Sequence, residues 1–177
     1  MTMRAKLFAM AAAVAATAAM AGEALAQQVA NRVEAYRDWS VFTADANGPV
    51  CWIVTQPKSW EARRGGNRVT VNRGDIYLMV AIRPQQGVGN EISVVSGYPY
   101  RDGSSVRAEI GGTRYEMFTQ GENAWLRPGS DDGMVEAMKR GSSAVVTGVS
   151  SRGTTTIDRF SLLGFTDALN AARRRCG

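Results

Sequence analysis

The chain contains no histidine, and this absence removes much of the usual chemistry of hydrolases. Ser-His-Asp and Cys-His catalytic arrangements are excluded, because both use an imidazole as the general base. Zinc sites that combine cysteine with histidine are excluded for the same reason. The spacings Ser-x-x-Lys, Gly-x-Ser-x-Gly and Gly-x-Gly-x-x-Gly and the phosphate-loop pattern are also missing. The sequence therefore predicts no enzyme, no cofactor and no metal site.

Long apolar runs are scarce, and the one near the N-terminus is an export signal. Arg4 and Lys6 precede an apolar run of small residues over 7–22, and the Ala-x-Ala cleavage site at 24–26 follows it. This order is typical of a secretory signal peptide, with cleavage expected after Ala26. No later segment approaches ~20 consecutive apolar residues, so we expect no transmembrane segment in the mature chain. The signal predicts a periplasmic protein, and peripheral association with the outer membrane is a further expectation.

Charge of one sign is not concentrated on any element. The chain has 21 Lys and Arg against 16 Asp and Glu, a formal net charge of +5. A nucleic-acid-binding protein would show dense basic clustering, so we expect no nucleic-acid partner. We interpret residues 173–175 (Arg-Arg-Arg) as cations that complement a helix C-terminus rather than as a contact with anionic lipid. Four further arginines are interpreted as parts of a solvated loop rather than an anion site: Arg63, Arg64, Arg68 and Arg73.

Cysteine is limited to Cys51 and Cys176, which both follow the export signal. An oxidising compartment and an even number of cysteines favour a disulfide between them. A redox pair or a metal site is the weaker alternative, because the chain has no Cys-x-x-Cys and no histidine. The bridge would close most of the chain into one loop, which is worth about 4–5 kcal/mol in the chain-entropy model.

From Trp39 onward, short β-branched and aromatic runs alternate with turn residues. Short strands at this spacing are typical of an antiparallel sandwich or barrel. Residues 58–67 are predicted to be an exposed loop instead, and residues 27–38 a loose arm or short helix. The predicted strands are 39–43, 50–55, 68–71, 75–83, 91–96, 106–110, 113–118, 124–126, 144–149 and 154–160.

Two segments have helical rather than strand patterns. Residues 130–140 begin with a capping serine, carry Asp131 and Asp132 at the positive end of the helix dipole, and end before a glycine. Together with Glu136 these acids are interpreted as a helix start rather than as a calcium or magnesium site. Apolar residues recur at helical spacing over 165–176, so this helix has one apolar face that ends in a cysteine.

The fold class predicted from these elements is all-β. We expect an antiparallel β-sandwich or barrel, with a short helix before the last hairpin and a C-terminal helix packed on the sheet. The domain organisation is predicted as a cleaved signal peptide over 1–26, an N-terminal arm over 27–38 and a single β-sandwich domain over 39–177.

Aromatic residues are the best candidates for a partner contact. Three tryptophans lie within strand patterns and are expected in the core: Trp39, Trp52 and Trp125. Trp60 and the loop around Pro99 fit core packing less well. We therefore predict an exposed partner contact made by Trp60, Tyr98 and Tyr100.

Several segments together resemble one protein family. Trp39-Ser40-Val41, Cys51 with its flanking apolar strand, and Val80-Ala81-Ile82-Arg83-Pro84 carry the earlier part of the resemblance. The most specific part is a C-terminal block over 148–154, 160–162 and 164–169 that ends at Cys176. From about Trp39 to Cys176 the chain resembles the invasion-associated locus B family of alphaproteobacterial envelope proteins. The resemblance implies an exported β-sandwich of the periplasm or outer membrane, linked in pathogenic members to host-cell entry. It carries over no established catalytic residues.

These observations lead to one expected function and two alternatives. We expect an exported, non-enzymatic cell-envelope protein that binds an envelope or host-surface partner. The first alternative is a carboxylate-dependent hydrolase of wall or surface glycans, because such an enzyme needs only two acids in one cleft. The second is a structural or stress-protective envelope component. The identity of the ligand and the oligomeric state stay open at this point.

Overall fold

The computed structural model describes residues 30–45 and 47–177, so the predicted signal peptide lies outside the described residues. No helix in these two ranges is long and apolar enough to cross a membrane. The described residues form two α-helices, α1 (Asp131–Arg140) and α2 (Phe165–Cys176), and the short 3-10 helix η1 (Pro84–Gln86). The strands are β1 (Asn31–Tyr36), β2 (Trp39–Asp45), β3 (Pro49–Thr55), β4 (Ser59–Arg64), β5 (Asn67–Arg68), β6 (Tyr77–Arg83), β7 (Val88–Val95), β8 (Ser105–Ile110), β9 (Thr113–Gln120), β10 (Asn123–Trp125), β11 (Ser143–Val149) and β12 (Thr155–Ser161).

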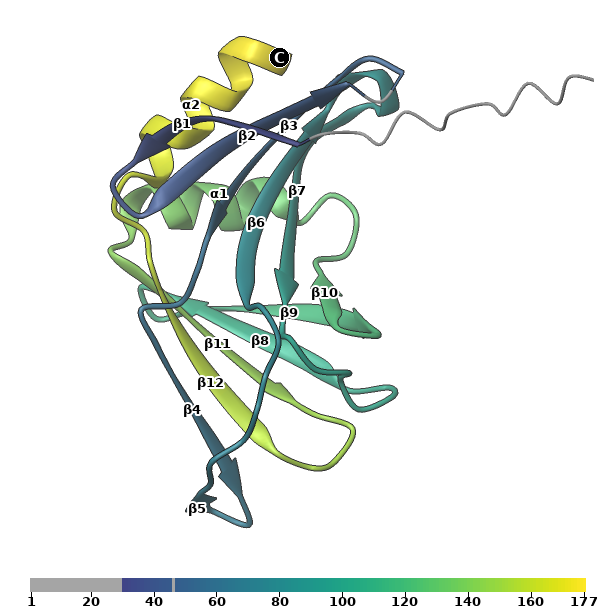
Figure 1. Cartoon of the computed structure of the whole chain (residues 1–177), viewed down its shortest axis with the longest axis vertical. Coiled ribbons are helices and arrows are strands. Elements are labelled where there is room, and N and C mark those ends of the chain that lie inside the picture. The colour runs from purple at the N-terminus through teal and green to yellow at the C-terminus, as the bar shows by residue number, and fades with distance from the viewer. Residues whose placement is uncertain (1–29, 46) are drawn as a thin grey trace, which may run out of the picture.

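All 12 strands belong to one antiparallel sheet, in the order β1-β2-β3-β6-β7-β10-β9-β8-β11-β12-β4-β5. The sheet bends into two halves where β7 meets the short strand β10, which pairs with it only over Asn123–Trp125. The first half runs from β1 to β7, and the second half runs from β10 to β5 (Figure 1). The two outer strands do not pair with each other, so the sheet is strongly curved but not closed.

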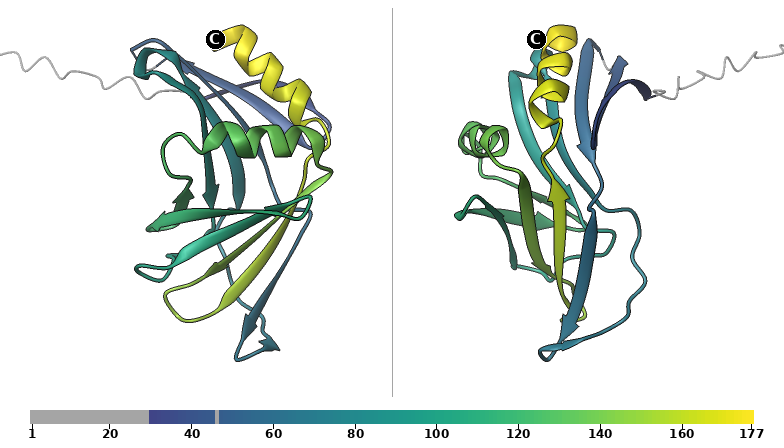
Figure 2. Two further views of the ribbon diagram at one scale, coloured as in Figure 1. Left: turned by 180° about the vertical axis from the view of Figure 1, so that it is seen from behind. Right: turned by 90° about the vertical axis from the view of Figure 1, so that its left-hand side faces the viewer.

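Strand periodicity places one face of the sheet in the core. Leu78, Val80 and Ile82 of β6 are buried, and the residues between them are half-buried on the outer face. Figure 2 shows both helices on the inner face of the first half. Helix α1 contributes buried methionines such as Met134, and α2 contributes Phe165, whose ring lies edge-on to the Trp39 ring at 5.0 Å. The predicted all-β class with these two helices is confirmed.

A disulfide between Cys51 and Cys176 fixes α2 to the sheet. The Sγ atoms are 2.08 Å apart, the Cα atoms are 5.9 Å apart, and the two residues are separated by 125 positions. Strand β3 carries Cys51 and pairs with β2 and β6, so the bridge joins the last residue of α2 to the interior of the first half-sheet. The disulfide predicted from the compartment and the cysteine count is confirmed.

Two segments form strands that the sequence did not predict, whereas the strand predicted over 68–71 includes only Arg68 of β5. Residues 31–36, expected to be part of an arm or short helix, form β1, which pairs with β2 from Asn31 to Tyr36. Residues 59–64, expected to be an exposed loop, form β4, which pairs with β12. Both segments are rich in polar residues of low strand propensity, and backbone pairing with a neighbouring strand overrides that propensity. Gly65 and Gly66 link β4 to β5 in a turn that needs positive φ at both positions.

The start of α1 also differs in its detail. Ser130 makes no capping hydrogen bond with its side chain. Instead, Asp131 accepts a hydrogen bond from the Ile92 backbone N–H of β7 at 2.8 Å, and Asp132 accepts one from the Asn90 side chain at 2.7 Å. Burial raises the pKa of Asp131 above its ordinary value. The first acids of the helix therefore attach α1 to the sheet.

We predict that the double variant Cys51→Ser/Cys176→Ser loses about 2–5 kcal/mol in its free energy of unfolding. The physical reason is that the unfolded chain regains the freedom that the long disulfide loop removes. Urea denaturation of protein purified without reductant measures the change. Dithiothreitol should destabilise the wild type by a similar amount and leave the double variant unaffected. Equal unfolding midpoints for the wild type and the double variant would contradict the prediction.

Candidate functional site

The inner face of the second half-sheet changes from apolar to polar along β12. Phe160 lies in the core near the helices, whereas Asp158 and Thr156 further along the strand are also buried. In the neighbouring strand β4, Trp60 is opposite Asp158 and Ala62 is opposite Thr156. Because paired residues point to the same face, the side chains of Trp60 and Asp158 lie side by side. The end of the sheet remote from the helices is therefore lined with polar groups.

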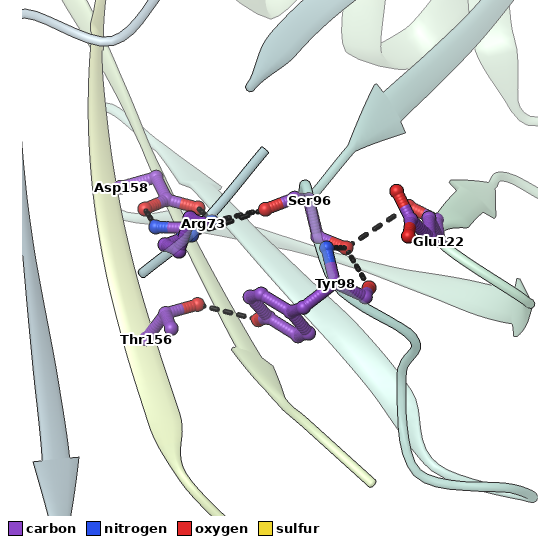
Figure 3. Close-up of polar contacts among 6 residues, drawn as sticks. All are labelled: Arg73, Ser96, Tyr98, Glu122, Thr156 and Asp158. Carbon is purple, nitrogen blue, oxygen red and sulfur yellow. Dashed lines mark hydrogen bonds and ion pairs between the residues drawn. The ribbon is translucent and has the colours of Figure 1, made fainter. Parts of the chain in front are cut away.

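Arg73 neutralises the buried carboxylate at this end. It lies in the connection between β5 and β6, and its two Nη atoms donate to the two carboxylate oxygens of Asp158, with Nη2 2.9 Å from Oδ2. Its Nε and Nη2 also donate to the Ser96 carbonyl oxygen, at 3.0 and 2.7 Å (Figure 3). The side chains of Arg73 and Asp158 are each only 2% exposed. This bidentate, fully hydrogen-bonded geometry is what allows an ion pair to be buried.

Two of the predicted contact residues enclose this arginine. The Arg73 guanidinium carbon lies 5.1 Å from the Trp60 ring centroid and 5.0 Å from the Tyr98 ring centroid. Both distances are typical of cation–π contacts. The Tyr98 hydroxyl lies 2.6 Å from the Thr156 hydroxyl, and burial raises the pKa of Tyr98 to about 12. The structure thus brings Trp60 and Tyr98 together around Arg73, although Trp60 keeps 42% of its surface exposed.

The prediction that Tyr100 is an exposed contact is wrong. Tyr100 is 4% exposed, its ring lies edge-on to Tyr98 at 5.3 Å, and burial raises the pKa of its hydroxyl. The loop folds back onto the sheet because the Tyr100 N–H donates to the Gly121 carbonyl and the Arg101 N–H donates to the Val149 carbonyl. These backbone hydrogen bonds join residues distant in sequence, so the local loop pattern carries no sign of them.

The core prediction for tryptophan holds only for Trp39. Trp52 and Trp125 are half-buried on the outer face of the sheet. The Trp52 ring stacks on the Phe42 ring with centroids 5.5 Å apart, and the ring centroids of Trp125 and Phe118 are 5.8 Å apart. In β3, Cys51 and Ile53 point inward, so strand alternation turns Trp52 outward. An aromatic residue in a strand pattern can occupy either face, and the structure decides which.

A cavity of about 550 Å³ opens beside the Arg73–Asp158 pair. Its wall is formed by β4, the β5–β6 connection, the loop after β7, and the turn between β11 and β12. Arg64 of β4 lines it, and its Nε and Nη2 donate to the Thr154 hydroxyl at 3.1 and 2.7 Å. The interpretation of Arg73 as a solvated loop residue is therefore wrong, because its side chain is buried. Arg64 is exposed as expected, but it lies in β4 rather than in a loop and lines the cavity.

Metal chemistry has no candidate site in the described parts of the chain. No group of three or more Cys, Asp or Glu residues in these ranges is arranged to hold a metal ion. The acidic cluster at the start of α1 binds neighbouring protein groups instead: Asp131 and Asp132 bond to β7, and Glu136 forms an ion pair with Lys139. The cavity at the polar end of the sheet is thus the site with the most distinctive chemistry.

Comparison with known proteins places the chain in a family. Residues 39–173 match the family model described as invasion associated locus B (IalB) protein. The chain belongs to the IalB family. No curated protein matches this IalB-family chain. It is similar in structure to invasion associated protein B from Bartonella henselae, with a TM-score of 0.56 and 18% sequence identity over 80% of this chain and 95% of that chain. At this identity the match shows a shared fold.

We predict that Asp158→Asn lowers the free energy of unfolding by about 3–5 kcal/mol, because the Arg73 charge stays buried without its counter-ion. Urea denaturation measures the loss. The double variant Arg73→Met/Asp158→Leu should lose much less than the sum of the two single changes, since it removes both charges together.

Arg114→Gln is the matched control for this prediction. Arg114 pairs with Glu109 at 3.4 Å on the surface, where both side chains are well exposed. Removing such an exposed pair changes the free energy of unfolding by no more than about 1 kcal/mol. If Asp158→Asn were as mild as Arg114→Gln, the ion pair would not be a buried, stabilising element.

Proposed function

We propose that this IalB-family protein is an exported, non-enzymatic component of the cell envelope that binds an envelope or host-surface partner. The partner is held in the polar cavity beside Arg73 and Asp158. The observation that carries this proposal is a cavity of about 550 Å³, a volume within the usual range of ligand sites, that lies beside a buried ion pair. Its wall is fixed by a buried ion pair, so little ordering of the protein opposes binding.

Export is supported by three independent features. The sequence begins with a signal-peptide pattern, the described residues contain the Cys51–Cys176 disulfide, and the chain belongs to the IalB family. Disulfides persist in oxidising compartments such as the periplasm. We propose that the protein resides in the periplasm. Binding to a partner at the outer membrane would hold it at the inner surface of that membrane.

Binding is favoured over glycan hydrolysis by the state of the acids at the cavity. A carboxylate-dependent hydrolase needs one acid to donate a proton and a second to attack or activate water. Asp158 uses both carboxylate oxygens on Arg73 and is almost fully shielded from solvent. Among the acids in the described ranges, Glu122 is the one that lines the cavity, and it forms no such ion pair. This arrangement supports recognition rather than a two-carboxylate mechanism.

We expect a photoreactive benzoylphenylalanine at Ser151, an exposed residue of the cavity wall, to form a discrete adduct in intact cells. Short-range crosslinking reports what occupies the cavity. Cell fractionation followed by mass spectrometry of the adduct identifies the partner and its compartment.

Thr113 provides the control position. It is exposed and pairs with Ile110 at the end of β8 near the helices, so it lies at the opposite end of the sheet from the cavity. The same photoreactive residue there should give no such adduct. Identical products from both positions, or none from Ser151, would refute the proposed binding site.

A further inference from the structure

Two arginines bring uncompensated positive charge to the cavity. Arg64 donates only to the neutral Thr154 hydroxyl, and within the described ranges Arg152 has neither a hydrogen bond nor an ion pair. Arg68 of the neighbouring strand β5, by contrast, forms an ion pair with Glu61 at 2.5 Å. Charge left unpaired inside a concave surface raises the local concentration of anions.

The strand register places these two cations on the same wall. Arg63 is opposite Thr155 in the β4–β12 pair, so Arg64 reaches Thr154, and Arg152 lies two positions before Thr154 in the same turn. Arg73 adds no net charge, because Asp158 neutralises it. The acid that lines the cavity, Glu122, comes from the turn between β9 and β10. The cavity thus has a cationic wall formed by Arg64 and Arg152.

The remaining lining groups are suited to hydroxyl-rich ligands. Thr70, Asn72 and Ser151 line the cavity with exposed hydroxyl and amide groups that make no side-chain hydrogen bond elsewhere in the described chain. They supply both donors and acceptors, and the Glu122 carboxylate supplies acceptors alone. Pro99 adds a small apolar surface at the same site. Sugars present this combination of polar hydroxyls and apolar ring carbons.

We propose that the cavity binds an anionic sugar, that is, a saccharide carrying a carboxylate or a phosphate group. Arg64 and Arg152 hold the anionic group, and the hydroxyl and amide side chains bind the sugar hydroxyls. The Thr154 hydroxyl orients the planar Arg64 guanidinium and leaves further N–H donors for the ligand. The inference rests on the proposed function, since it names the chemical class that the partner presents to the cavity.

Titrations monitored by ¹H–¹⁵N NMR of the mature, disulfide-bonded protein test this proposal. The probes are D-glucuronate for the carboxylate class, glucose 6-phosphate for the phosphate class, and glucose and inorganic phosphate as the separate halves. At least one charged sugar should shift the amide signals of Asn72, Ser151 and Thr154. Glucose should bind at least about tenfold more weakly than that charged sugar, because a hydrogen bond to a charged group contributes about 1.5–3 kcal/mol. Which of the two charged sugars binds identifies the anionic group.

Charge-removing variants locate the contact. Arg64→Gln and Arg152→Gln should each weaken binding of the charged sugar by about tenfold or more. Arg114→Gln removes the same charge from a surface position remote from the cavity and should bind as the wild type does. Well-dispersed amide spectra confirm that each variant is folded.

Three results would overturn the proposal. If inorganic phosphate bound as tightly as the charged sugars, the cavity would be a site for anions in general rather than for sugars. If glucose bound as tightly as the charged sugars, the arginines would make no contribution to ligand binding. Unchanged cavity amides with all four probes would refute sugar binding. If the Ser151 crosslink to a partner persisted in that last case, the proposed function would stand and this inference alone would fail.

Discussion

The buried ion pair of Arg73 and Asp158 holds together the end of the sheet that is remote from the helices. It joins the β5–β6 connection to β12, and the carbonyl oxygen of Ser96, which follows β7, accepts hydrogen bonds from Nε and Nη2 of the guanidinium. Removing both charges from water carries a large desolvation penalty, which two carboxylate contacts, a carbonyl acceptor and two aromatic rings offset here. The β5–β6 connection, the residue after β7 and strand β12 are thus joined through this one pair.

The two ends of the domain are stabilised by different forces. Near the helices, a continuous apolar core and the Cys51–Cys176 disulfide hold α2 against the first half-sheet. At the other end, ion pairing, hydrogen bonding and cation–π contacts add to the packing of the Tyr98 and Tyr100 rings. This division leaves a rigid scaffold at one end and a polar, solvent-accessible cavity at the other. A recognition site is more easily accommodated at the polar end, because its chemistry does not compete with the core.

Family membership and structural similarity carry different information about this protein. The IalB family model covers residues 39–173, which places the chain among the invasion associated locus B proteins. The Bartonella henselae protein shares the fold at only 18% identity, so the fold tolerates extensive replacement of side chains. Strand alternation and core volume can be preserved by many sequences. The chemistry of the cavity depends instead on individual residues of this chain, such as Arg64 and Arg152.

The sequence alone determined the elements whose signals are local. Strand periodicity identified β6 and the β11–β12 hairpin, helical spacing identified α2, and the cysteine count in an exported chain identified the disulfide. Only the tertiary structure showed that polar residues form β1 and β4, that Tyr100 is buried, and that Arg73 is neutralised by a carboxylate 85 residues away. The physical reason is that these outcomes depend on partners distant in the chain, and local periodicity contains no record of which distant groups will meet.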